Sequence, residues 1–436
     1  MGLDRIKVLS SSLLNISFCL LFTFSVLPNA MQSIVFFLFI LSTIICNYRF
    51  DNKEFSIQKK IRFLIPITGY YIFYLFTFFY PSTLELQTSI IQSSFLLLII
   101  PILLIFFQNS NVQISKGLII TIFTISNFIL IFLIINYLLE GLQLSYNYYA
   151  NDTTDFSNYE KVDLVTFFLT NSFEFINSLA EWGFKRDGQI KELNNHHAYL
   201  SAVINLNIIM LVSEAIYQTK YLKRILYILA IIILVLSVIY LNSKTNFLFL
   251  VIYILFLIAL FFLKSKSYQK LLIISIIVTS SIFVLKKINY TSESYLEFVK
   301  DSERIKLYKN LYPIIKKHLP IGIGGNNINS EINLVMKQDS TSYIYSFNVL
   351  TNHSHAHSQY LHYLISGGVI NLLLFIIMIA YLFCFFLKTK NIFGCLFILL
   401  IALNCLFEDF FNRAWGVYTF SLGLIYSWYY NLSKKT

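Results

Sequence analysis

Charged residues are scarce in this chain: Asp, Glu, Lys and Arg make up only 13% of its 436 residues. A soluble globular protein carries roughly 25%. Hydrophobic residues reach 57%, and the mean hydropathy is +0.68. A water-facing fold could not hide that much apolar side chain, so the sequence predicts an integral membrane protein and excludes a disordered chain.

Cysteine, glycine and proline are also few, with 5, 14 and 6 residues. The low glycine and proline content excludes a collagen-like repeat, and five cysteines in a chain of this length exclude a disulfide scaffold. The cysteines lie inside or at the ends of apolar runs, which indicates small buried side chains. The net charge of +11 suggests nucleic acid at first sight. However, lysines scattered between apolar segments have a simpler explanation in membrane topology, so we expect no nucleic-acid partner.

Apolar segments long enough to cross a membrane recur along the whole chain. Crossing about 30 Å of hydrocarbon takes roughly 20 mostly apolar residues. We therefore predict an all-α, polytopic membrane protein with about twelve transmembrane helices and one large periplasmic loop that contains short helices. The expected spans are 9–27, 31–47, 63–80, 88–107, 118–139, 196–217, 225–241, 245–263, 271–287, 358–387, 391–407 and 414–431.

Lys and Arg are concentrated in alternate short connections, which predicts the orientation of these spans. Positive residues beside a span are retained in the cytoplasm, so both termini are expected there. Two long segments then lie outside: an acidic one at 140–195 and a basic one at 288–357. The chain accordingly divides into N-terminal helices (1–287), the large periplasmic loop (288–357) and C-terminal helices (358–436).

The basic loop shows a helical pattern near its start. Apolar residues recur at helical spacing over 294–317, with cations on the other side, which predicts an amphipathic helix near the outer membrane–water boundary. The helix should end at Pro320. The glycine-rich stretch 322–327 predicts a flexible turn that is unsuited to nucleotide phosphate, because no strand precedes it.

Histidines gather where the basic loop meets the tenth span: His353, His355, His357 and His362 lie within ten residues. They could be solvated loop residues, or the His-x-His-x-His run could bind a metal. A third interpretation is a general base, because imidazole titrates at about pH 6.5 and can take a proton from a sugar hydroxyl. That role requires an external donor with a good leaving group, such as a glycan on a lipid diphosphate.

External cations fit such a donor. A departing diphosphate gains negative charge, and a positioned Arg or Lys stabilises that charge most in the transition state. The candidates are Arg304 in the basic loop and Lys244 and Arg413 in two short external turns. The alternative for each is a basic side chain that simply reaches lipid headgroups.

His357 is followed by Ser358, nine further residues, Gly368 and Asn371. This pattern resembles the signature of the O-antigen ligase and O-antigen polymerase superfamily. There, a His followed by Asn, Ser or Gln precedes nine residues and then Gly-x-x with a small residue. Asn371 stands where the family usually has glycine.

Other segments resemble that superfamily in the same order along the chain. Arg304 and Tyr308 resemble its Arg-x-x-x-Tyr/Trp segment, and 320–324 resembles its Pro-x-Gly-x-Gly turn. Lys244 occupies the place of arginine in a Ser/Thr-Arg turn, which keeps the charge but loses the bidentate fork. The stretch 195–200 also resembles a family pattern, and there His197 could contact the donor or simply cap a helix.

The resemblance implies an inverting glycosyltransferase that takes glycan from undecaprenyl diphosphate at the periplasmic face of a bacterial inner membrane, with no metal or other cofactor. It implies His357 and Arg304 as catalytic residues and Lys244 at the diphosphate, and we expect Arg413 and His197 at the same group. The expected activity is O-antigen ligation onto lipid A-core. Polymerisation of two lipid-linked glycans shares the donor chemistry and stays open. Transport of lipid-linked glycan is a third possibility, disfavoured because charges are nearly absent from the span interiors.

Overall fold

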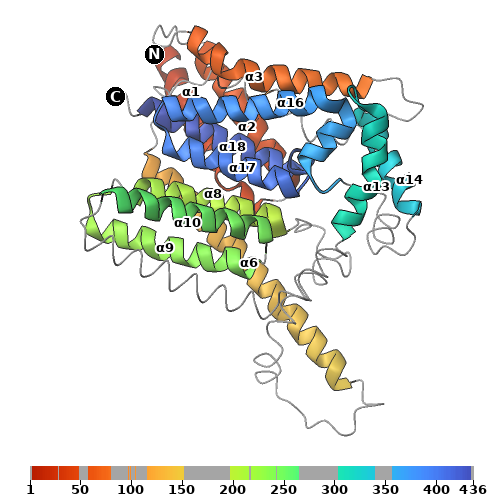
Figure 1. The fold of residues 1–436 in the computed structure, drawn as a ribbon. Coiled ribbons are helices and arrows are strands. Elements are labelled where there is room, and N and C mark those ends of the chain that lie inside the picture. Colours follow the sequence, from red (N-terminus) through yellow and green to blue (C-terminus); the bar gives the residue numbers. More distant parts are fainter. Residues whose placement is uncertain are drawn as a thin grey trace.

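The computed structural model describes residues 2–27, 29–48, 57–79, 97, 99, 104, 115–151, 197–215, 218–241, 243–264, 303–338 and 356–433. All regular secondary structure among them is helical, as the sequence predicts (Figure 1). The α-helices are α1 (Gly2–Leu21), α2 (Asn29–Tyr48), α3 (Ile57–Phe76), α6 (Lys116–Asn151), α8 (His197–Ala215), α9 (Tyr221–Tyr240), α10 (Lys244–Lys264), α13 (Glu303–His318), α14 (Ile328–Gln338), α16 (Gln359–Lys388), α17 (Ile392–Phe407) and α18 (Ala414–Ser433). Short 3-10 turns are η1 (Phe24–Val26), η2 (Thr77–Phe79), η5 (Gly325–Asn327) and η6 (Phe410–Asn412).

Most predicted spans coincide with a described helix. Spans 88–107 and 271–287 fall largely or wholly outside the described residues, so the total of twelve stays a prediction. Helix α6 continues to Asn151, into the segment 140–195 that the sequence analysis placed outside the membrane. The extension contains no proline, and each added residue gains a helical hydrogen bond. Figure 1 shows this end of α6 projecting beyond the bundle.

The protein is a multi-pass membrane protein. Among the described helices, α6, α8, α9 and α16 contain segments long and apolar enough to cross a membrane, and shorter apolar helices accompany them. Helices α8 and α9 differ sharply, because α8 is almost wholly buried whereas most of α9 is exposed. The exposed side chains of α9 include Leu226, Ile233 and Leu236. An apolar face of this kind suits contact with lipid.

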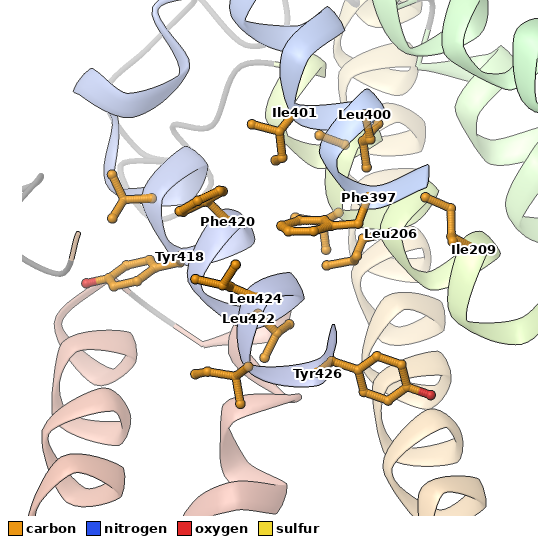
Figure 2. Close-up of a cluster of buried hydrophobic side chains, with 14 of the residues drawn as sticks. Leu206, Ile209, Phe397, Leu400, Ile401, Tyr418, Phe420, Leu422, Leu424 and Tyr426 are labelled. Carbon is orange, nitrogen blue, oxygen red and sulfur yellow. The ribbon is translucent and has the colours of Figure 1, made fainter. Parts of the chain in front are cut away.

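The buried helices α8, α17 and α18 pack through large apolar side chains. Figure 2 shows Leu206 and Ile209 of α8 near Phe397 of α17, with Phe420 of α18 beside it. The rings of Phe397 and Phe420 lie 5.9 Å apart. Close packing of this kind holds membrane helices together. It also fixes the end of α17, from which the site described below extends.

Hydrogen bonds join the same ends of helices that are distant in sequence. The hydroxyl groups of Ser33 (start of α2) and Tyr418 (start of α18) lie 2.7 Å apart. The start of α10 is joined to the start of α8 where Asn246 donates to the Ala198 carbonyl at 2.8 Å. These ends correspond to turns that the sequence analysis placed outside. The side of the membrane that this end faces, and the location of both termini, stay predictions.

Helices α13 and α14 lie beside the start of α16 at this end (Figure 1). Leu307 and Leu311 of α13 are buried, whereas Lys309, Lys316 and Lys317 are exposed. The amphipathic helix is thus confirmed from residue 303, and 294–302 lies outside the described residues. The division into segments 1–287, 288–357 and 358–436 stays a prediction.

Candidate functional site

Helix α16 is broken at two glycines, and a turn of the large loop packs into the break. Gly367 and Gly368 have non-helical backbone angles, with φ 65° and ψ −160° at Gly368. The break frees the carbonyls of Ile365 and Ser366 from helical pairing. They accept hydrogen bonds from the N–H groups of Ile323 at 2.9 Å and Gly324 at 2.8 Å.

The fit between the turn and the break requires a glycine at residue 368. A Cβ atom there would lie 1.8 Å from the Pro320 carbonyl oxygen. The turn expected at 322–327 is therefore present, but it is not flexible in the way its glycine content suggested, because backbone hydrogen bonds attach it to α16. Two segments that carried the family resemblance, 320–324 and Gly368, are in direct contact.

His357 lies in the short turn that precedes α16. Its side chain is half-buried, and its φ of 51° is in the left-handed region that non-glycine residues seldom occupy. Ser358 then begins the helix, and its hydroxyl accepts from the N–H of Leu361 at 3.5 Å. On the other side, Tyr308 of α13 donates its hydroxyl to the His357 carbonyl at 3.4 Å.

The connection between α17 and α18 is hydrogen-bonded to the first residue of α16. The N–H of Gln359 donates to the Glu408 carbonyl at 3.1 Å, and the Gln359 side chain accepts from the Phe411 N–H at 2.7 Å. The backbone N–H groups of Ala356 and Ser358, which flank His357, lie close enough to the Asp409 carboxyl to lower its pKa. The turn that follows α17 is thus attached to Gln359, two residues after the candidate base.

Asp409 is a buried carboxyl whose protonation is sensitive to its surroundings. Burial, and next the Glu408 carboxyl, raise the pKa of Asp409 to about 7, although Arg413 and the N–H groups of Ala356 and Ser358 act in the opposite direction. Sequence reasoning missed Asp409. Two consecutive carboxylates between apolar runs were the signal that could have revealed it.

His362 lies one helical turn into α16 and is almost wholly buried. Its Nε2 lies 3.1 Å from the Tyr74 hydroxyl of α3, and its Nδ1 lies 3.0 Å from the Asn412 amide nitrogen. The interpretation of this residue as a solvated loop histidine is therefore wrong. His353 and His355 lie outside the described residues. The described part of the chain contains no cluster of three or more possible metal ligands.

The predicted cations Arg304 and Arg413 lie at the start of α13 and directly after η6, at the end of the bundle that contains the His357 turn. Arg304 is the second residue of α13, one turn before Tyr308, and residues four apart share a helix face. Tyr308 contacts His357, so Arg304 lies one helical turn from a residue that contacts the candidate base. Arg413 follows η6, is exposed, and lies close enough to Asp409 to lower its pKa.

Lys244 and His197 are the first residues of α10 and α8. The two helix starts are joined to α17 by buried amides: Asn246 donates to the Ala198 carbonyl at 2.8 Å and to the Asn404 side chain at 3.0 Å. Asn404 lies one helical turn before Glu408. Both predicted residues are thus attached, through their neighbours, to α17, which ends two residues before Asp409. The roles of all five predicted residues stay predictions.

Comparison with known proteins identifies one family. Residues 228–376 match the family model described as O-antigen ligase (Wzy_C). The matched segment includes Lys244, Arg304 and His357, and it leaves His197 and Arg413 outside. No curated protein matches the chain. Proteins of this family transfer lipid-linked glycans, and the matched segment of this chain is similar to them.

Proposed function

We propose that this protein transfers a glycan from undecaprenyl diphosphate to lipid A-core at the periplasmic face of a bacterial inner membrane, as an O-antigen ligase. The observation that carries the proposal is the location of the family match. It spans Lys244, Arg304 and His357, whose three helix ends belong to one hydrogen-bonded end of the bundle.

The chemistry follows from the residue types. His357 accepts the proton of the acceptor hydroxyl as its oxygen attacks the anomeric carbon. The new C–O bond forms on the face opposite the bond to phosphate, which breaks and releases undecaprenyl diphosphate. Attack from the opposite face inverts the anomeric centre.

The cations act on the leaving group. Arg304, Lys244 and Arg413 stabilise the charge that develops on the diphosphate, and His197 contacts the same group. His357 is half-buried between the buried residues Ala356 and Ser358, which suits a base that must meet a substrate from solvent or lipid. The half-buried position is the reason we assign the base to His357 and not to His362.

The test is transfer with purified protein in lipid nanodiscs. The donor is a defined glycan on undecaprenyl diphosphate, and lipid A-core and a second lipid-linked glycan compete as acceptors. The expected product is glycan on lipid A-core with inverted anomeric configuration. A product extended on the lipid carrier would instead identify a polymerase. Movement of donor between leaflets with no new glycosidic bond would identify a transporter.

A further inference from the structure

Three side chains from distant parts of the sequence form a closed ring of hydrogen bonds next to the candidate site. Tyr74 of α3, His362 of α16 and Asn412 of η6 are the members. The Tyr74 hydroxyl donates to the Asn412 side-chain oxygen at 3.3 Å. The two contacts of His362 at 3.1 Å and 3.0 Å complete the ring.

With the Asn412 amide in this orientation, the ring closes with one placement of protons. Tyr74 gives its hydrogen to Asn412, so its oxygen must accept from His362, and Nε2 therefore carries the proton. Nδ1 then has a free lone pair, which accepts from the Asn412 amide nitrogen. His362 is accordingly a neutral imidazole with both nitrogens in use, and neither nitrogen is available to deprotonate a substrate.

The position of the ring shows what it holds. His362 also donates its backbone N–H to the Ser358 carbonyl at 2.9 Å, and Asn412 donates its backbone N–H to the Asp409 carbonyl at 3.2 Å. The ring therefore joins the His357 turn to the 408–413 turn from the side of α3. The Gln359 side chain joins the same two turns separately. Asn412 immediately precedes Arg413, so fixing its side chain also fixes where Arg413 begins.

We propose that His362 is a positioning residue that, through Asn412, places Arg413 to bind the diphosphate of the lipid-linked donor. This inference rests on the proposed function for the identity of the donor. It assigns no proton transfer to His362. Tyr74 and Asn412 belong to the same hydrogen-bonded ring. A search of the sequence for catalytic residue types would not select these two residues.

The test compares replacements that keep or remove the hydrogen-bonding pattern. His362→Gln retains one acceptor and one donor, whereas His362→Leu retains neither and has similar bulk. Tyr74→Phe removes the hydroxyl through which the ring closes. Tyr363→Phe is the matched control, because it removes a hydroxyl from the adjacent residue of α16 that is outside the ring. The measurements are KM and kcat for the donor, the Kd for undecaprenyl diphosphate, and the melting temperature.

Positioning predicts a specific pattern. His362→Leu and Tyr74→Phe weaken undecaprenyl diphosphate binding by about tenfold or more, the scale of losing a charged hydrogen bond, and raise KM more than they lower kcat. His362→Gln and Tyr363→Phe stay close to the unaltered protein. Unchanged Kd and KM in His362→Leu, with or without a lower melting temperature, would overturn the inference.

Other outcomes separate this inference from the proposed function. If His362→Gln loses kcat as completely as His362→Leu at unchanged Kd, the imidazole itself acts and the positioning role is wrong. If the unaltered protein forms no glycosidic bond but binds undecaprenyl diphosphate in a His362-dependent manner, the proposed function fails and the positioning role stands. Absence of binding by the unaltered protein overturns both.

Discussion

His357 and His362 lie five residues apart in the sequence, and the structure gives them opposite surroundings. His357 is half-buried in a non-helical turn, whereas His362 is 2% exposed and has both ring nitrogens engaged. A general base needs a lone pair that substrate can reach. The difference shows that histidine spacing alone does not identify the base, because an imidazole with both nitrogens hydrogen-bonded within the protein, as in His362, has no lone pair to offer a substrate.

The backbone at the two positions differs as well. His362 has ordinary helical pairing, while the φ of 51° at His357 costs roughly 1–3 kcal/mol that surrounding contacts must offset. Those contacts include the Tyr308 hydroxyl and both the backbone N–H and the side chain of Gln359. The fold thus stabilises an unfavourable conformation at the residue that we assign to the chemistry.

Replacing His357 should have the largest effect on transfer and is the strongest test of its contrast with His362. His357→Ala is expected to lower the transfer rate by about 10²–10⁴, the usual contribution of a general base. His357→Asn is the sharper variant, because asparagine tolerates positive φ and so keeps the turn. Both should be equally inactive in the nanodisc assay, and His357→Asn should also keep the melting temperature of the unaltered protein. Restored activity in His357→Asn would show that the backbone conformation matters and the imidazole does not.

Altering the glycine break should affect the His357 region through α13. Gly368→Ala places a Cβ against the Pro320 carbonyl at a positive φ, so we expect destabilisation of about 3 kcal/mol or more. The turn at 320–324 would separate from α16, and transfer would be lost. Gly69→Ala is the control, since a Cβ there meets nothing within 4 Å. Thermal unfolding in detergent measures both, and an unchanged melting temperature in Gly368→Ala would contradict the packing described here.

The contrast between local and long-range features explains what the sequence could predict. Hydropathy located helices such as α16 and α17 because membrane insertion depends on local composition, and motif order predicted that Gly368 and 320–324 matter. The partnership of Tyr74, His362 and Asn412 could not be predicted, because it joins residues 288 and 50 positions apart. Asp409 was missed because its effect on the His357 turn depends on burial, which arises only when α17 and α16 pack together.

Arg304→Lys tests whether the chemistry on the His357 side needs a guanidinium. Lysine keeps the charge but loses the planar fork that pairs with phosphate. We expect kcat to fall by about 10–100-fold, somewhat less than for loss of a complete transition-state contact. Lys309→Arg, on the exposed part of α13, is the matched control and should have no effect. An unaltered rate in Arg304→Lys would indicate that a point charge is sufficient.

The smallest expected effect is a change in stability with pH that arises from the Asp409 carboxyl. The pKa of Asp409 is about 7 in the folded protein against an ordinary value of 3.8, so between these values the folded state binds more protons than the unfolded state. The contribution of Asp409 to stability is therefore fully present below about pH 4 and is lost as pH rises to about 7. The asparagine in Asp409→Asn cannot titrate. As pH rises across this window, the melting temperature of the unaltered protein should therefore fall relative to that of Asp409→Asn, and the difference should level off above about pH 7. Because groups distant from Asp409 titrate alike in both proteins, the difference reports Asp409 together with its coupled neighbour Glu408. A pH-independent difference would mean that this carboxyl stays ionised, and the His357 turn would then be held by a permanent charge and not by one that changes near neutral pH.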